Sequence, residues 1–248
     1  MNRFFIPLPS PTPDRLDITD PALLHRMRDV LRLKPDDVVV VFDNSGWEHE
    51  VLLEQVGPDR ILGRIRRTRL CQNEPRIQVT LYQAVLKGER FEWALQKGTE
   101  VGVSVFVPLL SERCIVQDAH QLSRRKLQRW EKILQAAAEQ SRRGRVPALQ
   151  PLLLFAAACE QVHRSGTLAL LPWEEASTPL REVLEEARPE SPFNVAIFIG
   201  PEGGFSEAEV QLAGRYGLRP VRLGPRILRA ETAGVVATAL VLYHYGDL

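Results

Sequence analysis

Apolar and polar residues follow two different patterns along the chain, with the change near residue 72. Up to that point, short apolar or alternating runs are separated by turn residues, which is typical of β-strands. Strands are expected at residues 38–42, 47–53 and 60–65. A short helix is expected from Asp20 through Leu31, and four prolines between positions 7 and 13 favour an extended beginning. We therefore predict a small β-rich domain at residues 1–72.

The rest of the chain, residues 73–248, alternates predicted strands with predicted helices. The expected strands are 77–82, 103–110, 167–172 and 195–199, and the expected helices begin at Glu89, at Ser123 and at Ala233. Strands that alternate with helices are typical of a mainly parallel sheet, so the expected fold class is α/β. The last helix, up to Tyr245, is apolar nearly all round and must be covered on every side, either by the domain core or by another subunit.

The helix that Ser123 caps carries an apolar stripe that includes Trp130, and it is expected to end at Gly144. Glu139 and Arg143 lie four residues apart in it, which predicts an ion pair worth about 0.2–0.5 kcal/mol. Such a pair would give these two residues a structural role.

The segment IGPEGGFS at residues 199–206 joins a predicted strand to a predicted helix. Its glycines allow backbone conformations and close ligand approaches that a Cβ atom would forbid. Ser206 and Glu209 have the spacing of a capping box, and Phe205 can meet Val210 as a hydrophobic staple. A strand, a glycine loop and a capped helix in this order place backbone N–H groups at the sheet edge where open α/β folds bind ligands.

This first glycine loop favours a ligand without phosphate. It matches neither GxxxxGK[ST] nor GxGxxG, the two phosphate-binding patterns. Glu202 also places a carboxylate where a phosphate would be repelled by like charge. Taken alone, the segment is equally compatible with a tight strand-to-helix turn that binds nothing.

A second segment, residues 221–233, repeats the design with a short strand, a Gly-Pro turn and a helix that has charged residues at its start. Two such loops about one βαβ unit apart leave the same edge of a parallel sheet and can converge on one crevice. The exit of the strand at 167–172 provides a third loop at that edge. Together these loops predict one ligand pocket.

These segments resemble the signature motifs of the 16S rRNA (uracil-N3) methyltransferases. The first pair of motifs is IGPEGGFS followed by LGPRILRAETA at 223–233. The family's segment K…QKATELGV…SER is similar to Lys87-Gly88, QKGTEVGV at 96–103 and SER at 111–113. Its segment AAEQSGR…VP is similar to AAEQSRR at 137–143 with Val146-Pro147. The resemblance covers most of the chain from Lys87 onward, in order and at compatible spacing. Gly98, Val101 and Ala230 stand where Ala, Leu and Thr are usual, and Arg142 stands where a small residue is usual.

The resemblance implies both a fold and a reaction. The family belongs to the SPOUT class of trefoil-knotted methyltransferases, which use S-adenosylmethionine and are homodimers with the site shared between chains. The implied fold is a small PUA-like β-barrel at 1–72 that binds RNA, followed by a SPOUT α/β domain at 73–248 with a deep C-terminal trefoil knot. The implied activity is methylation of N3 of a uridine in 16S rRNA, with 16S rRNA or the small ribosomal subunit as partner.

The three loops at the sheet edge are the expected cofactor site, largely through backbone groups. The expected contacts are Leu171, Pro172, Ile199, Gly200, Pro201, Gly203, Gly204, Leu223, Gly224, Arg226, Ile227 and Leu228. A Gly203→Val change is expected to abolish cofactor binding if the loop touches the cofactor.

Two charged residues just beyond the second loop are the catalytic candidates. Uracil N3 is mostly protonated at neutral pH, so methylation requires this proton to be removed or the resulting anion to be stabilised. Arg229 is suited to stabilise an anion on uracil O2 or O4, and Glu231 to orient this arginine or to accept the proton. An ordinary ion pair at the start of a helix is the alternative for both residues.

Basic residues gather in short clusters at 64–69, 124–126 and 142–145, and such clusters can neutralise phosphates. The candidate RNA contacts are Arg3, Arg26, Arg28, Arg113, Gln140 and Arg143, the last three because they match family motif positions. A solvated surface is the simpler interpretation of any one cluster alone. Three clusters in a nearly neutral chain favour a basic face.

Composition excludes several other classes of protein. The 248 residues carry 32 Lys and Arg against 31 Asp and Glu, a net charge of +1, which does not by itself indicate a nucleic-acid binder. No apolar run is long enough for a membrane span and the beginning lacks the features of a signal peptide, so a cytoplasmic protein is expected. Three scattered cysteines and five dispersed histidines, without CxxC or HExxH, predict no disulfide framework and no metal site.

Two other functions fit parts of the sequence. A non-catalytic RNA-binding protein of ribosome assembly would keep the barrel and the basic face but would show disrupted glycine loops, and these loops are intact. A different α/β enzyme with a phosphate ligand would need Lys or Arg inside the first glycine loop, where Glu202 stands. Binding of S-adenosylmethionine separates the methyltransferase from both.

Overall fold

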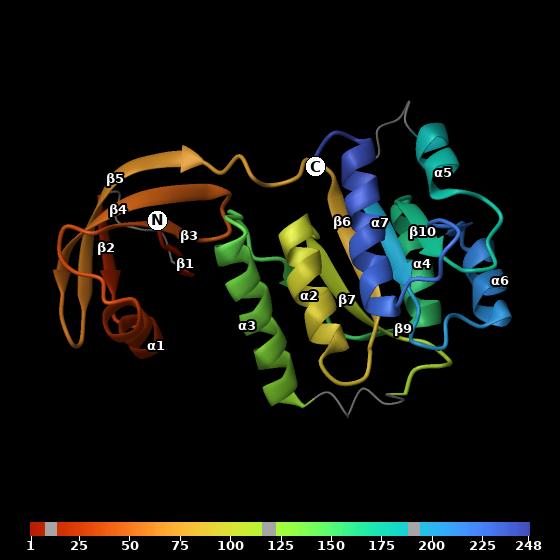
Figure 1. Cartoon of the computed structure of the whole chain (residues 1–248), viewed down its shortest axis with the longest axis horizontal. Coiled ribbons are helices and arrows are strands. Elements are labelled where there is room, and N and C mark those ends of the chain that lie inside the picture. Colours follow the sequence, from red (N-terminus) through yellow and green to blue (C-terminus); the bar gives the residue numbers. More distant parts are fainter. Residues whose placement is uncertain (8–13, 116–122, 188–193) are drawn as a thin grey trace. The chain divides into compact units, whose positions relative to one another are not determined.

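The computed structural model describes residues 1–7, 14–115, 123–187 and 194–248. The chain forms two compact units (Figure 1). The first unit comprises residues 1–74 together with 138–146, and the second comprises residues 75–137 and 147–248. Each unit has its own sheet and its own hydrophobic core.

The first unit is built on a curled five-stranded sheet (Figure 1). Its strands are β1 (Arg3–Phe5), β2 (Arg15–Ile18), β3 (Val38–Phe42), β4 (Trp47–Val56) and β5 (Ile61–Leu70), in the order β1-β3-β4-β5-β2. The pairing of β1 with β3 is parallel and the other pairings are antiparallel. This agrees with the predicted β-rich character of the first part of the chain, although β5 is longer than expected and includes the first basic cluster.

A short helix closes the core of this sheet. Helix α1 (Pro21–His25) continues into a π-helical turn, η1 (Arg26–Val30), as expected for this segment. The Asp20 side chain caps α1 by accepting a 2.8 Å hydrogen bond from the N–H of Leu23. The core residues that pack together here include Phe4, Leu16, Met27, Val39 and Leu53, all buried.

The second unit contains a seven-stranded sheet whose pairings are all parallel, which confirms the predicted α/β class. Its strands are β6 (Gln78–Ala84), β7 (Val105–Leu110), β8 (Ala148–Leu149), β9 (Leu153–Leu154), β10 (Leu168–Pro172), β11 (Asn194–Ile199) and β12 (Arg219–Val221). Their order is β12-β10-β11-β6-β7-β8, with β9 also pairing with β7. The helices are α2 (Arg90–Val101), α3 (Arg124–Gln140), α4 (Phe155–Ser165), α5 (Leu180–Ala187), α6 (Glu207–Arg215) and α7 (Ala230–His244).

Helices cover both faces of this sheet. Successive residues of a strand point to opposite faces, so neighbouring residues of one strand pack against different helices. On one face, Phe198 of β11 and Tyr82 of β6 stack with ring centroids 4.3 Å apart and belong to the core cluster of α4 and α6. On the other face, Leu81 and Gln83 of β6 lie directly under Gly234 of α7, where a Cβ atom would stand 3.0 Å from Gln83 Oε1. Helix α2 packs beside α7 on that face (Figure 1).

The expected end of the third helix is wrong by several residues. Helix α3 ends at Gln140, not at Gly144, because Arg142 adopts a left-handed conformation with φ of 63°. The backbone N–H of Arg143 then bonds back to the carbonyl of Ala138 at 2.9 Å, as in the helix-ending motif that usually contains glycine. The ion pair expected within this helix is replaced by two others: Glu139 pairs with Arg26 at 2.6 Å, and Arg143 pairs with Glu74 at 2.8 Å.

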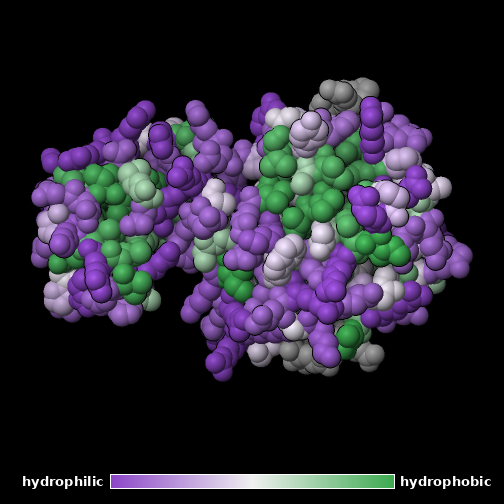
Figure 2. All heavy atoms as spheres, in the orientation of Figure 1, coloured by the Kyte–Doolittle hydropathy of each residue, from purple (hydrophilic) through white to green (hydrophobic). Residues whose placement is uncertain are grey.

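Helix α7 presents part of its apolar surface to solvent. Gly234, Ala237 and Val241 are buried against the unit, whereas Leu240 and Tyr243 are 40% and 72% exposed. Hydrophobic residues accordingly gather on the surface over α7 in Figure 2. Within the described ranges, no helix is both long and apolar enough to cross a membrane.

Candidate active site

Loops from neighbouring parallel strands meet at one edge of the second unit's sheet. Strands β12, β10, β11 and β6 are adjacent and point the same way, so their carboxyl ends share this edge. A pocket of about 360 Å³ opens there. Its lining residues are Arg90, Pro172, Glu174, Ile199, Gly200, Pro201, Glu202, Gly204, Phe205, Ile227, Leu228, Arg229, Ala230, Glu231 and Ala233. The two glycine loops therefore converge on one crevice, as their spacing predicted.

A second pocket of about 350 Å³ adjoins the first. It shares with it the residues Pro172, Glu174, Ile227, Leu228 and Ala233, and it adds Trp173, Arg222, Leu223, Gly224, Pro225 and Arg226. The two adjoining spaces thus share lining residues from the end of β10 and from the segment after β12. Together they are large enough for a drug-sized ligand, for which pockets of about 300–1,000 Å³ are usual.

Ten of the twelve expected cofactor contacts line one or both pockets, and two do not. Leu171 is fully buried in the core of the unit. Gly203 faces outward, since a Cβ atom added there would meet only the Arg113 side chain at 3.5 Å. The structure therefore brings the three loops together but leaves these two side-chain positions outside the pockets.

Close backbone packing requires glycine at two positions of the first loop. A Cβ atom on Gly200 would lie 3.1 Å from the backbone of Gly204 and Phe205. Gly204 has a φ of 68°, and a Cβ atom there would lie 3.1 Å from Oε1 of Glu174. The glycines of the loop that are most sensitive to substitution are thus Gly200 and Gly204. A larger residue is therefore expected to impair cofactor binding at Gly204 and not at Gly203.

Ser206 holds the helix that follows this loop. Its side chain accepts a hydrogen bond from the N–H of Glu209, and the Glu209 carboxylate accepts one from the N–H of Ser206, which confirms the predicted capping box. The Ser206 hydroxyl also donates to Glu112 at 2.5 Å, and the N–H of Glu112 donates to Glu209 at 2.9 Å. The SER segment after β7 therefore braces the start of α6.

The two catalytic candidates lie at the start of α7, facing the first pocket. Arg229 occupies the N-cap position and is exposed, and Glu231 lies in the first turn. One carboxylate oxygen of Glu231, Oε2, is buried and has no hydrogen-bond partner among the described residues. Arg229 and Glu231 do not form an ion pair with each other or with another described residue, in contrast to the ordinary pair at the start of a helix. The Arg229 side chain is thus exposed at the pocket, and the Glu231 carboxylate lines it with one unused acceptor.

Sequence reasoning missed two charged residues of the pocket. Glu174 follows β10 and is the one carboxylate that borders both spaces. Arg90 begins α2 and pairs with Glu202 at 3.4 Å, and Glu202 also accepts a hydrogen bond from the N–H of Lys87 at 3.1 Å. The signal for Glu174 was its position in the predicted third loop. The signal for Arg90 was weaker, since only the parallel pairing of β6 with β11 brings its loop to this edge.

The six predicted RNA contacts have different surroundings. Arg26 and Arg28 are 43% and 37% exposed, and they pair with Glu139 and Asp29. The hydrogen bond from Arg28, followed by that with His25, lowers the pKa of Asp29 to about 2. Gln140 is exposed.

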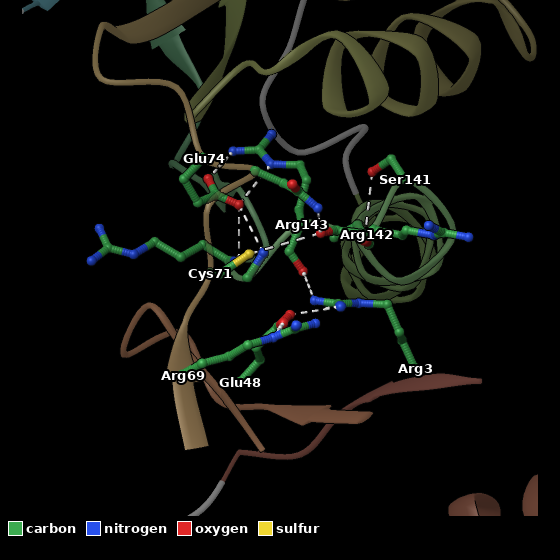
Figure 3. A network of polar contacts seen from close by, with 12 residues as sticks. Arg3, Glu48, Arg69, Cys71, Glu74, Ser141, Arg142 and Arg143 are labelled. Atoms are coloured by element: carbon green, nitrogen blue, oxygen red, sulfur yellow. Dashed lines mark hydrogen bonds and ion pairs between the residues drawn. The ribbon is translucent and has the colours of Figure 1, made fainter. Parts of the chain in front are cut away.

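The surroundings of Arg3 and Arg143 favour a structural role over the RNA contact that the sequence predicts. The Arg3 side chain is 8% exposed, pairs with Glu48 at 2.7 Å and donates to the carbonyl of Arg143 at 3.1 Å (Figure 3). The Arg143 side chain is 4% exposed and pairs with Glu74. Buried arginines that are held by carboxylates are not available to a phosphate. Arg113 is exposed, but its Nη1 donates to the carbonyl of Gly203 at 2.8 Å.

No group of three or more His, Cys, Asp or Glu side chains is arranged to hold a metal ion in the part of the chain that the structure describes. The cysteines Cys71, Cys114 and Cys159 are all buried and unbridged. Burial, followed by the charge of Glu209, raises the pKa of the Cys159 thiol to about 12. A thiol in this state is a packing residue and not a nucleophile.

A parallel α/β unit with glycine loops at its carboxyl edge, and with charged groups facing the pocket they enclose, is the architecture of an enzyme that binds an organic ligand there. A family model described as an RNA methyltransferase domain matches residues 72–242. Because this match covers most of the chain, the chain belongs to this family of RNA methyltransferases.

Curated relatives and solved structures agree with the family. The chain is 37% identical over 223 residues to ribosomal RNA small subunit methyltransferase E of Synechocystis, a match that covers 89% of this chain and 70% of the relative. It is similar to the structure of ribosomal RNA small subunit methyltransferase E from Neisseria gonorrhoeae bound to S-adenosyl methionine, with a TM-score of 0.86, 32% identity and coverage of 98% and 97% of the two chains. A methyltransferase from Legionella pneumophila in complex with the cofactor SAM matches with a TM-score of 0.84, 30% identity and coverage of 97% and 96%.

Proposed function

We propose that this chain transfers the methyl group of S-adenosylmethionine to N3 of a uridine in 16S ribosomal RNA. The single observation that carries the proposal is the convergence of both glycine loops on one pocket that Arg229 and Glu231 also line. The relatives named ribosomal RNA small subunit methyltransferase E, and the solved structures with bound cofactor, support the same activity. Intact glycine loops argue against a non-catalytic RNA-binding protein.

The residues of the two pockets fit S-adenosylmethionine. Three carboxylates, those of Glu174, Glu202 and Glu231, outnumber the two arginines that line the first pocket, which favours a cationic ligand over one with a phosphate. Gly200 and Gly204 line the first pocket without side chains, so their backbone groups would be open to the cofactor. When bound, the cofactor supplies a methyl group on a positively charged sulfur.

The chain's own residues then position the uracil and manage its proton. Arg229 is placed to stabilise negative charge on a uracil carbonyl oxygen, because its guanidinium is exposed at the pocket and free of carboxylate partners among the described residues. Glu231 is placed to accept the N3 proton, since its side chain lines the first pocket and one of its oxygens has no hydrogen-bond partner among the described residues. Holding the two reactants in line can replace about 7–11 kcal/mol of the barrier.

The finer features of the architecture belong to the same proposal. The curled sheet of the first unit supports a PUA-like, RNA-binding domain, and the parallel sheet of the second supports a SPOUT domain with a C-terminal trefoil knot. The exposed apolar face of α7, with Leu240 and Tyr243, supports a homodimer, because such a face is normally covered. We place the reaction in the cytoplasm, on 16S rRNA or the small ribosomal subunit.

Calorimetry with S-adenosylmethionine tests the cofactor half of this proposal. The full-length chain is expected to bind S-adenosylmethionine at micromolar concentration with one site per chain. No detectable binding at this concentration would exclude the methyltransferase and leave an RNA-binding protein. S-adenosylhomocysteine, which lacks the positive charge on sulfur, serves as the matched ligand and reports how much the carboxylates contribute.

A further inference from the structure

Two basic clusters that lie far apart in the sequence meet in the first unit. A cavity of about 620 Å³ is lined by arginines from both the 64–69 cluster and the 142–145 cluster. Its lining residues are Met1, Arg3, Val40, Glu48, Arg67, Arg69, Leu70, Gln72, Asn73 and Arg142. Four arginines and one glutamate give the lining side chains a formal charge of +3, so the cavity suits an anion.

The one carboxylate of the cavity is already engaged. Glu48 is 5% exposed and forms ion pairs with both Arg3 and Arg69, as Figure 3 shows. Burial alone would raise its pKa, but the hydrogen bonds from the two arginines outweigh this and hold the pKa below its ordinary value. Glu48 is therefore ionised and fixes the position of Arg69, whose side chain is still 52% exposed.

Local backbone geometry places Arg67 beside Arg69. The pairing of β4 with β5 shifts register between Glu50 and Val51, which leaves Arg66 as an extra residue in β5. Arg67 and Arg69 follow this bulge two residues apart, so their side chains point to the same face of the strand. Arg67 is exposed and forms no ion pair with any described residue.

Arg142 borders the cavity in a strained conformation. Its φ of 63° is one that glycine adopts freely and arginine only at a cost. The Arg142 guanidinium has no hydrogen bond or ion pair among the described residues, and its side chain extends away from the Glu48 network in Figure 3. Strain of this kind persists where the surrounding structure holds it, and it is concentrated at functional sites.

We propose that this cavity, which we call the Arg67–Arg142 pocket, binds phosphates of the RNA backbone. Arg67 and Arg142 supply the unpaired guanidinium groups, and Arg69, oriented by Glu48, supplies a third. Planar guanidinium groups suit phosphate oxygens because they can donate two parallel hydrogen bonds. The inference rests on the proposed function, in that the RNA is the methylated substrate, and it assigns part of the substrate's binding to three residues of the first unit.

Fluorescence anisotropy with a labelled fragment of 16S rRNA transcript, recorded over a series of salt concentrations, tests the proposal. The variants are Arg67→Gln and Arg142→Gly in the full chain, and Arg66→Gln is the matched control, since Arg66 is the adjacent arginine of β5 and does not line the cavity. Each of the first two variants is expected to lower the slope of log K against log salt by about 1, as the loss of one phosphate contact does. The control is expected to keep the wild-type slope.

Arg142→Gly gives a readout that a purely structural role would not produce. Glycine relieves the strained backbone, so the melting temperature is expected to rise by about 2–4 °C while RNA affinity falls. Wild-type salt slopes in both variants would overturn the inference, as would a fall in RNA affinity that only accompanies a lower melting temperature.

Binding of S-adenosylmethionine tests the proposed function separately. Neither Arg67→Gln nor Arg142→Gly is expected to change this binding. If the wild type fails to bind S-adenosylmethionine, the methyltransferase fails. If the wild type binds both ligands and both variants bind RNA as the wild type does, only the phosphate pocket fails.

Discussion

The Nη1 atom of Arg113 donates a 2.8 Å hydrogen bond to the carbonyl oxygen of Gly203. The bond ties the exposed loop after β7 to the outer side of the glycine loop after β11, while the inner side of that loop lines the pocket. Arg113 therefore holds the glycine loop from the side opposite the pocket. The same two segments are joined again through Glu112 and Ser206, so the loop is fixed before any ligand arrives.

Gly204→Ala is expected to weaken S-adenosylmethionine binding at least tenfold, whereas Gly203→Ala is expected to change it little. A Cβ atom at Gly204 meets Oε1 of Glu174 at 3.1 Å and requires a residue with φ of 68°, a conformation that costs about 1–2 kcal/mol without glycine. A Cβ atom at Gly203 makes only ordinary contacts. Calorimetry on both variants measures the difference. Equal effects at the two positions would show that the pocket-facing side of the loop is assigned wrongly.

Glu231→Gln is expected to lower kcat roughly 100- to 10,000-fold, the usual contribution of a general base, with cofactor affinity nearly unchanged. The substitution keeps the shape of the side chain and removes the proposed acceptor of the N3 proton. Glu207→Gln is the control, because Glu207 also lies in the first turn of a helix but does not line the pocket. Single-turnover rates with saturating cofactor give the comparison, and a wild-type rate for Glu231→Gln would remove Glu231 from the mechanism.

Leu240→Glu is expected to convert the proposed homodimer into a monomer, because Leu240 lies on the exposed apolar face of α7. Leu154→Glu is the matched control, since Leu154 is also an exposed leucine of the second unit, 62% accessible, but lies on β9. Sedimentation velocity at micromolar concentration distinguishes the two species. A dimer that survives Leu240→Glu and dissociates with Leu154→Glu would place the interface elsewhere.

Acid is expected to destabilise the first unit through Glu48. Burial by itself raises the pKa of this carboxyl, but hydrogen bonds from Arg3 and Arg69 outweigh it, so the folded-state pKa lies below the ordinary 4.5. A lowered pKa stabilises the fold above the ordinary value, and this stability is lost as the pH falls through the folded-state value. Urea unfolding between pH 6 and pH 3 should therefore show a decline that Glu48→Gln reduces.

The same variant is expected to lose about 3 kcal/mol of unfolding free energy at pH 7, because Arg3 is left buried without its carboxylate. Glu54→Gln is the control, since its ion pair with Arg64 is exposed and such pairs contribute about 0–1 kcal/mol. Equal losses in the two variants would contradict the structural role of Glu48.

Cys159 is expected to resist alkylation in the folded chain at pH 8. With a pKa of about 12, only roughly one thiol in 10,000 is ionised at that pH, and the side chain is fully buried. Peptide mass spectrometry after treatment with iodoacetamide should find Cys159 modified in urea but not in buffer. Rapid labelling of the native chain would mean that the core around α4 opens more readily than its packing implies.

Features that depend on nearby residues were predictable from the sequence. The Ser206–Glu209 capping box follows from a three-residue spacing, and the buried strands follow from apolar runs that need no distant partner. The convergence of the two glycine loops was also predictable, because parallel strands place all their carboxyl ends at one edge.

Features that depend on distant partners were not predictable. Arg3 pairs with Glu48, and Arg143 with Glu74, across 45 and 69 residues, so nothing local indicated that these arginines are buried. The end of α3 was missed because Arg142 takes a conformation that its residue type disfavours. Glu174 could be assigned to a loop but not to both pockets, since that requires the positions of β11 and β12.

The most direct test uses S-adenosylmethionine with a deuterated methyl group, the purified chain and unmodified 16S rRNA, followed by mass spectrometry of the digested nucleosides. The label is expected in 3-methyluridine, and it should be lost when Glu231→Gln replaces the wild type. Label in a 2′-O-methylated or C5-methylated nucleoside, or none at all from a chain that binds the cofactor, would contradict methylation at uracil N3.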